Sequence, residues 1–258
     1  MKPAGNPYTS VKTVRFRGPP PFARPRACSP LARWHCPPPR PAAPPQLYFA
    51  EDMNPRCRST MEDASAVVDG FGGDPNTGYF GVYDGHGGRN VAEFLRLHLH
   101  VNVERELQVK GDRSVEECLR AAFLYTDLSC HATGEQASGS TSVVCIVRRA
   151  GGARCVYTAN CGDARAVLCH GGAAVRLSKD HKATDAAERA RIEAGGGFVV
   201  RKRVMGVLAV ARSFGDFTLK KFVSAEPYTS TTMLNEEVRG WAAPPPLLHL
   251  RASGAAAC

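Results

Sequence analysis

Acidic residues are absent from the first 50 positions, which contain eight Lys and Arg residues and thirteen of the 19 prolines. Proline lacks an amide donor and restricts the residue before it, so this segment cannot build regular secondary structure. We expect residues 1–50 to form a disordered Pro/Arg-rich segment, and a ligand for proline-recognising domains is the alternative. Residues 51–258 hold 25 basic and 24 acidic side chains, so the net charge of +9 does not indicate nucleic-acid binding by the folded part.

The ten cysteines include no Cys-x-x-Cys pair, and the chain shows no apolar signal sequence. Several thiols lie inside apolar runs, as Cys145 and Cys155 do. This pattern predicts buried, reduced thiols in a cytoplasmic or nuclear protein and excludes a disulfide scaffold. No stretch approaches the roughly 18–20 apolar residues that a bilayer span requires. We expect a monomer that binds neither membranes nor nucleic acid.

Residues 51–237 alternate short apolar runs with helical patterns. Strands are predicted at 66–69, 78–83, 142–148, 154–160, 165–169 and 199–204. Helices are predicted at 89–108, from Ser114 with Glu117 completing a capping box, and at 185–194 with Asp185 and Glu188 as a second box. The Gly162-Asp163 pair indicates a hairpin turn. Sequential strands joined by tight turns, with helices between them, predict an α+β fold with mainly antiparallel sheets.

The strongest chemical signal is Asp84-Gly85-His86-Gly87-Gly88, which follows an apolar strand. A carboxylate at a strand end is held firmly, and a glycine beside it lets a main-chain carbonyl approach a cation closely. A plain β-turn is the alternative interpretation of the Asp-Gly pair.

Two further acidic motifs are candidate ligands. Glu62 and Asp63 are neighbours whose side chains would point to opposite faces of a regular strand, so one can bind an ion directly while the other supports the site. An exposed charged strand end is the alternative for this pair. Asp163 lies in the Gly162–Arg165 run, which a hairpin turn explains without any function. The runs at 139–141, 180–182 and 208–216 are weak signals individually.

Taken in order, these segments resemble the type 2C (PPM) metal-dependent protein serine/threonine phosphatases, with matching motifs from Arg58 to Asp216 and looser similarity to about Glu237. The resemblance implies a four-layer αββα sandwich of two antiparallel sheets flanked by helices. It also implies a site between the sheets that holds two Mg²⁺ or Mn²⁺ ions and acts on phosphoserine and phosphothreonine in phosphoprotein substrates.

The resemblance also implies individual roles. Asp84 would bridge the two metals, the carbonyl of Gly85 would complete one shell, and Glu62 would serve the other metal with Asp63 close by. Asp163 matches a position linked to a third, weaker ion. Arg58 would bind the substrate phosphate and His86 would be the general acid. Ligands that offer only oxygen favour such hard cations over zinc, and two ions can turn a shared water into a nucleophile.

The sequence departs from the family pattern beyond Asp216, where no aspartate occurs, although the family places two more metal-binding aspartates downstream. We therefore expect a partial phosphatase domain at 51–237, lacking its C-terminal part, and an unrelated, disordered Pro/Ala-rich tail at 238–258. Loss of two ligands predicts weak metal binding and an inactive or poorly folded chain. The alternative function is a non-catalytic fragment that binds phosphoproteins or another partner. Both ends of the chain are also consistent with a gene-model artefact or a splice variant.

Overall fold

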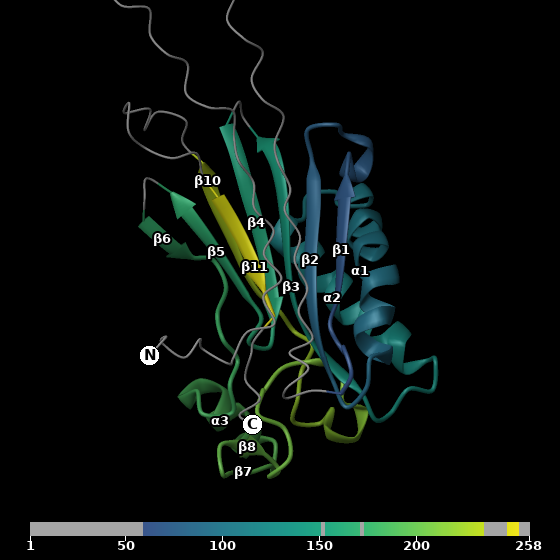
Figure 1. Ribbon diagram of the computed structural model, residues 1–258, viewed down its shortest axis with the longest axis vertical. Coiled ribbons are helices and arrows are strands. Elements are labelled where there is room, and N and C mark those ends of the chain that lie inside the picture. Colours follow the sequence, from purple (N-terminus) through teal and green to yellow (C-terminus); the bar gives the residue numbers. More distant parts are fainter. Residues whose placement is uncertain (1–58, 151–152, 171–172, 235–246, 253–258) are drawn as a thin grey trace, which may run out of the picture.

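The computed structural model describes residues 59–150, 153–170, 173–234 and 247–252 (Figure 1). The strands are β1 (Ala64–Asp69), β2 (Gly78–His86), β3 (Gly139–Ala150), β4 (Ala153–Cys161), β5 (Arg165–His170), β6 (Ala173–Arg176), β7 (Val199–Val200), β8 (Arg203–Val204), β9 (Phe214–Gly215), β10 (Tyr228–Leu234) and β11 (Leu247–Arg251). The helices are α1 (Asn90–Gln108), α2 (Val115–His131) and α3 (Ala186–Ala194), with short 3-10 turns η1 (Phe71–Gly73) and η2 (Phe217–Leu219).

The larger sheet is antiparallel and has the order β1-β2-β3-β4-β10, with β9 paired to the start of β3. Helices α1 and α2 cover one of its faces, as Figure 1 shows. Side chains alternate along β2, so Tyr79 and Tyr83 face the helices while Phe80 and Val82 face the other way into a second apolar cluster. Both faces of this sheet are therefore buried, which explains the continuous apolar runs of its central strands.

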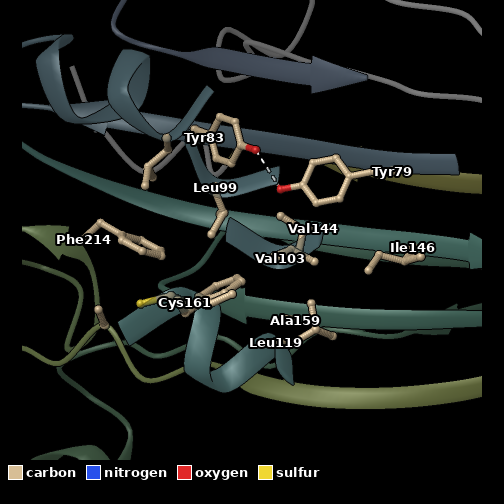
Figure 2. Packing of buried hydrophobic residues seen from close by; sticks show 14 of the residues in the cluster. Tyr79, Tyr83, Leu99, Val103, Leu119, Val144, Ile146, Ala159, Cys161 and Phe214 are labelled. Carbon is tan, nitrogen blue, oxygen red and sulfur yellow. Dashed lines mark hydrogen bonds between the residues drawn. The ribbon is translucent and has the colours of Figure 1, made fainter. Parts of the chain in front are cut away.

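The core between the larger sheet and its helices is built from strand and helix residues that fit the predicted periods. Figure 2 shows Leu99 and Val103 of α1 and Leu119 of α2 against the strand residues Val144 and Ile146. The hydroxyl groups of Tyr79 and Tyr83 lie 3.0 Å apart in this core and form a hydrogen bond with each other.

A second, smaller antiparallel sheet has the order β11-β5-β6 and packs on the opposite face of the larger one. Its strand β11 contributes Leu248 and Leu250, which are buried with Leu168 of β5 in the cluster between the sheets. The sequence predicted no regular structure in the tail at 238–258. The difference arises because residues 248–251 alternate apolar and polar side chains, and pairing with β5 buries Leu248 and Leu250.

Two sequence predictions, one of a hairpin and one of a strand, are wrong. β4 and β5 do not form a hairpin around Gly162-Asp163, because β4 pairs with β3 and β10 while β5 pairs with β6 and β11. The Gly162-Asp163 segment instead carries the chain from one sheet to the other. The predicted strand at 199–204 is split into β7 and β8 by Arg201 and Lys202, whose φ angles of 50° and 62° are those of a tight hairpin turn.

One of the two predicted capping boxes is formed. Ser114 and Glu117 form the predicted capping box of α2. Asp185 caps α3, but Glu188 does not complete a box, because its carboxylate binds the guanidinium groups of Arg191 and Arg212.

The fold is a mixed α+β arrangement with antiparallel sheets, in the order helices, larger sheet, smaller sheet. The outer helical layer expected on the smaller sheet is not formed by any residue in the described ranges, since α3 lies past the end of the sheets together with β7 and β8 (Figure 1). The six cysteines within these ranges form no disulfide, and Cys145 and Cys155 are buried as predicted. No described helix is both long and apolar enough to cross a membrane.

Candidate functional site

The end of β2 places two predicted site residues on the face of the larger sheet that looks toward the smaller one. Asp84 and His86 continue the alternation that puts Phe80 in the cluster between the sheets. Asp84 is buried and lies opposite Thr141 of β3, and His86 lies opposite Gly139. The carboxylate and the imidazole therefore lie at one end of the sheet face that carries the apolar cluster between the two sheets.

Asp63 joins Asp84 through the pairing of β1 with β2. Ala64 lies opposite Tyr83, and one further step of the same register places Asp63 opposite Asp84. Residues directly opposite in an antiparallel pair share a face, so the two carboxylates come to the same end of the sheet. Asp63 is also buried.

Glu62 approaches the same segment from the side of β1. A Cβ atom at Gly85 would lie 2.3 Å from the main-chain carbonyl oxygen of Glu62, so only glycine permits this packing of the two backbones. The amide of Gly88 donates a hydrogen bond of 3.1 Å to Oε1 of Glu62. The structure thus places Glu62, Asp63, Asp84, Gly85 and His86 at the adjoining ends of β1 and β2.

The donor set suits a hard divalent cation in its chemistry, because it consists of carboxylate and carbonyl oxygens. Thr141 lies opposite Asp84, and its hydroxyl is buried without a hydrogen-bond partner within the part of the chain that the structure describes. A buried polar group of this kind normally has a partner, so a ligand bound here could supply one. No three Asp, Glu, His or Cys side chains of the described residues are grouped closely enough to hold a metal. The two-metal centre therefore stays a prediction.

Asp163 lies on the crossing from β4 to β5, at the same end of the sheets. Its neighbour Gly162 packs on Thr141, where a Cβ at position 162 would lie 2.6 Å from the Cβ of Thr141. Asp163 is buried, and its Oδ2 lies 3.5 Å from Nζ of Lys182. The turn that carries Asp163 therefore lies beside Thr141 of β3, and Thr141 is the residue opposite Asp84 of β2.

Buried His181 positions this crossing. Its Nδ1 accepts a hydrogen bond of 3.2 Å from the amide of Gly162, and its own amide donates to the Gly162 carbonyl at 3.0 Å. Burial, reinforced by the charge of Arg212, lowers the pKa of His181 to about 4, which keeps the ring neutral and Nδ1 able to accept. The sequence analysis named this residue only within a weak motif.

His86 is paired with Asp216, a residue to which the sequence analysis gave no role. Nε2 of His86 lies 2.8 Å from Oδ2 of Asp216. Burial lowers the pKa of His86, but the hydrogen bond with Asp216 and the charges of Asp216, Asp84 and Glu62 outweigh it, so that the pKa is raised above its ordinary value. The imidazole is thereby kept in its proton-carrying form at higher pH, which suits a proton donor.

Arg58, the predicted phosphate-binding residue, lies outside the described residues. The partner of His86 was missed because 130 positions separate Asp216 from it, and no local spacing links the two. The only signal was the Gly215-Asp216 pair at the end of a motif that was weak on its own.

Comparison with known proteins identifies the family. The family model for protein phosphatase 2C matches residues 48–240. The protein phosphatase 2C homolog 1 of Schizosaccharomyces pombe is 40% identical over 187 residues, covering 71% of this chain and 54% of that protein. The homolog 1 of Saccharomyces cerevisiae is 35% identical over 205 residues, covering 74% and 73% of the two chains. This chain belongs to the protein phosphatase 2C family, whose members are metal-dependent protein serine/threonine phosphatases.

Solved structures show the same fold. A phosphatase from a pathogenic strain of Toxoplasma gondii superposes with a TM-score of 0.63 at 25% identity, covering 75% of this chain and 72% of that one. A Caenorhabditis elegans sex-determining protein gives a TM-score of 0.61 at 25% identity, with 70% and 47% covered. The chain spans about half the length of several of its curated relatives, including 50% of a probable protein phosphatase 2C of rice.

Proposed function

We propose that this end of the sheets is a phosphomonoester hydrolase site that acts on phosphoserine and phosphothreonine in proteins. Family membership supports the reaction class. The single observation that carries the assignment to these residues is their placement: Asp63, Asp84 and His86 come to one end of two neighbouring strands, with the Glu62 backbone packed on Gly85.

Mg²⁺ or Mn²⁺ is the cofactor of this proposal. Asp84, Glu62 and the carbonyl of Gly85 would hold two ions, Asp63 would support them, and Asp163 would contribute to a third, weaker position. When bound, such ions acidify a water to a nucleophile and neutralise phosphate charge. The protein's own contribution is to hold these oxygens at firmly anchored strand ends, where they need little reorganisation to act.

His86 acts as the general acid in this proposal. A serine or threonine alkoxide is a poor leaving group, and a proton donated by the imidazolium to the leaving oxygen is typically worth about 10²–10⁴-fold in rate. The raised pKa favours the protonated ring near neutral pH. Arg58 would bind the phosphate, a role that suits the planar guanidinium because it pairs with two oxygens at once.

The proposal is tested by Mn²⁺-dependent hydrolysis of a phosphothreonine peptide by the purified chain. Because the chain lacks two of the family's aspartates, we expect at most weak activity, which a chelator should abolish and Asp84→Asn should remove. Asp112→Asn is the matched control, since it deletes the same charge at an exposed turn outside the site. Activity that survives both the chelator and Asp84→Asn would contradict the assignment.

A second candidate is a non-catalytic phosphatase-like protein that binds phosphoproteins or another partner through the same face. It is favoured by the finding that the described residues do not gather three metal-binding side chains. Isothermal titration calorimetry with Mn²⁺ distinguishes the catalytic from the non-catalytic candidate. A catalytic site should take up two ions, whereas the non-catalytic alternative predicts one weakly bound ion or none, together with phosphopeptide binding that needs no metal.

A further inference from the structure

We propose that Asp216 is a positioning residue for His86, fixing both the tautomer and the orientation of the imidazole. This rests on the proposed role of His86 as the general acid. An ionised carboxylate can only accept hydrogen bonds, so the contact of 2.8 Å between Asp216 Oδ2 and His86 Nε2 requires the hydrogen on Nε2. In the neutral ring Nδ1 is then the free nitrogen, and it is the one left to exchange a proton with the site.

The loop that carries Asp216 is anchored on both sides. The amide of Asp216 donates to the carbonyl of Ser138 at 3.0 Å, and the amide of Gly215 donates to Oδ1 of Asp127 on α2 at 2.9 Å. Lys220 bridges the same Asp127 carboxylate and the carbonyl of Ser213. The loop is therefore tied to the start of β3 and to the helical layer, and this holds the carboxylate still.

The backbone at Asp216 adopts a conformation that costs free energy for a residue other than glycine. Its φ and ψ angles are 48° and 41°, in the left-handed region. Although Asp216 stands at the start of η2, its side chain makes no capping hydrogen bond there. Helix capping thus does not explain the aspartate, and its described contacts are with His86 and the hydroxyl of Ser213.

Space for the pair is provided by Gly139 of β3, which lies opposite His86 on one side and Gly215 on the other. A Cβ atom at position 139 would lie 2.2 Å from Oδ2 of Asp216 and 2.3 Å from Nε2 of His86. The hydrogen bond thus passes directly over a glycine. Because no left-handed φ is recorded for Gly139, its role here is steric, and any side chain would force the two groups apart.

A merely stabilising pair and a positioning pair differ in what they change. If Asp216 only stabilises the fold, its loss lowers stability and affects every substrate alike. If it positions the proton donor, its loss affects substrates according to how much their leaving group needs a proton. In a phosphothreonine peptide the threonine oxygen leaves as an alkoxide and needs a proton, whereas the nitrophenolate of p-nitrophenyl phosphate is a good leaving group and does not.

The test uses Asp216→Gly in the full chain, since glycine accepts the left-handed backbone and removes only the carboxylate. Asp112→Gly, at an exposed turn, is the matched control. Long-range ¹H–¹⁵N spectra at alkaline pH, with His86 signals assigned from His86→Asn, report which ring nitrogen carries the proton. We expect the proton on Nε2 in the wild type and in the control, and a mixture of tautomers in Asp216→Gly.

With Mn²⁺ present, we expect Asp216→Gly to lower kcat for the phosphothreonine peptide about 10- to 100-fold while changing hydrolysis of p-nitrophenyl phosphate less than about 3-fold. Gly139→Ala should reproduce both effects and serves if Asp216→Gly does not fold. An unchanged His86 tautomer in a folded variant, or equal losses on both substrates, would overturn the proposal. A wild-type chain without phosphatase activity would contradict the proposed function alone, because the spectra need no turnover and still decide the role of Asp216.

Discussion

Acidification tests whether His181 is neutral in the folded protein. Its Nδ1 accepts from the Gly162 amide, and burial lowers its pKa from 6.5 to about 4. The unfolded chain therefore binds a proton in this window that the folded protein does not, so stability is full above the ordinary pKa and falls as the pH drops toward the folded one. The two pKa values imply a loss of about 2 kcal/mol between pH 7.5 and pH 5.

The measurement is urea unfolding followed by far-ultraviolet circular dichroism across this pH range, for the wild type and His181→Asn. The asparagine carboxamide oxygen can accept from the Gly162 amide but does not titrate. Groups common to both proteins, including His86, whose raised pKa acts in the opposite sense, cancel in the difference. We expect the wild type to lose about 2 kcal/mol more than the variant. Parallel curves for the two proteins would show that His181 is not buried and neutral, and would refute the reasoning.

Three substitutions test other parts of the structure. Gly85→Ala should lower the free energy of unfolding by about 1–3 kcal/mol and impair the site, because the added Cβ would meet the Glu62 carbonyl. Urea unfolding at the wild-type midpoint would contradict that packing. Leu250→Ala in β11 should lower the free energy of unfolding by about 2–5 kcal/mol, because the side chain is fully buried. A thermal midpoint equal to that of the wild type would mean that this strand does not pack on the core. Glu188→Gln should cost about 1–3 kcal/mol by weakening the buried contact with Arg212, a loss that differential scanning calorimetry should detect.

Local patterns predicted much of the fold. The apolar run of β2 and the helical spacing of α1 were sufficient, because a short apolar run fits a strand buried on both faces and α1 buries one face of regular period. The Ser114 cap was predictable for a similar reason, since both partners lie within three residues. The strands and helices that build the site were therefore accessible from the sequence.

Pairings between distant segments were not accessible. A tight Gly-Asp turn is compatible with a hairpin and with a crossing between sheets, and only the partners of β4 and β5 decide between them. The strand β11 was hidden by the prolines and alanines before it, because a run of five residues carries little signal until a partner strand is known. For the site, the Asp84 and Glu62 motifs were visible, whereas Asp216 becomes relevant only once the fold places it on His86.

The central claim is that oxygen atoms of Asp84, Glu62 and Gly85 converge on a hard divalent cation, and Mn²⁺ binding tests it whether or not the chain turns over substrate. Electron paramagnetic resonance of the free ion gives the affinity of the wild type, of Asp84→Asn and of the exposed-turn control Asp112→Asn. We predict that Asp84→Asn weakens binding at least about 10-fold while the control does not. Equal affinity in all three proteins would contradict the claim.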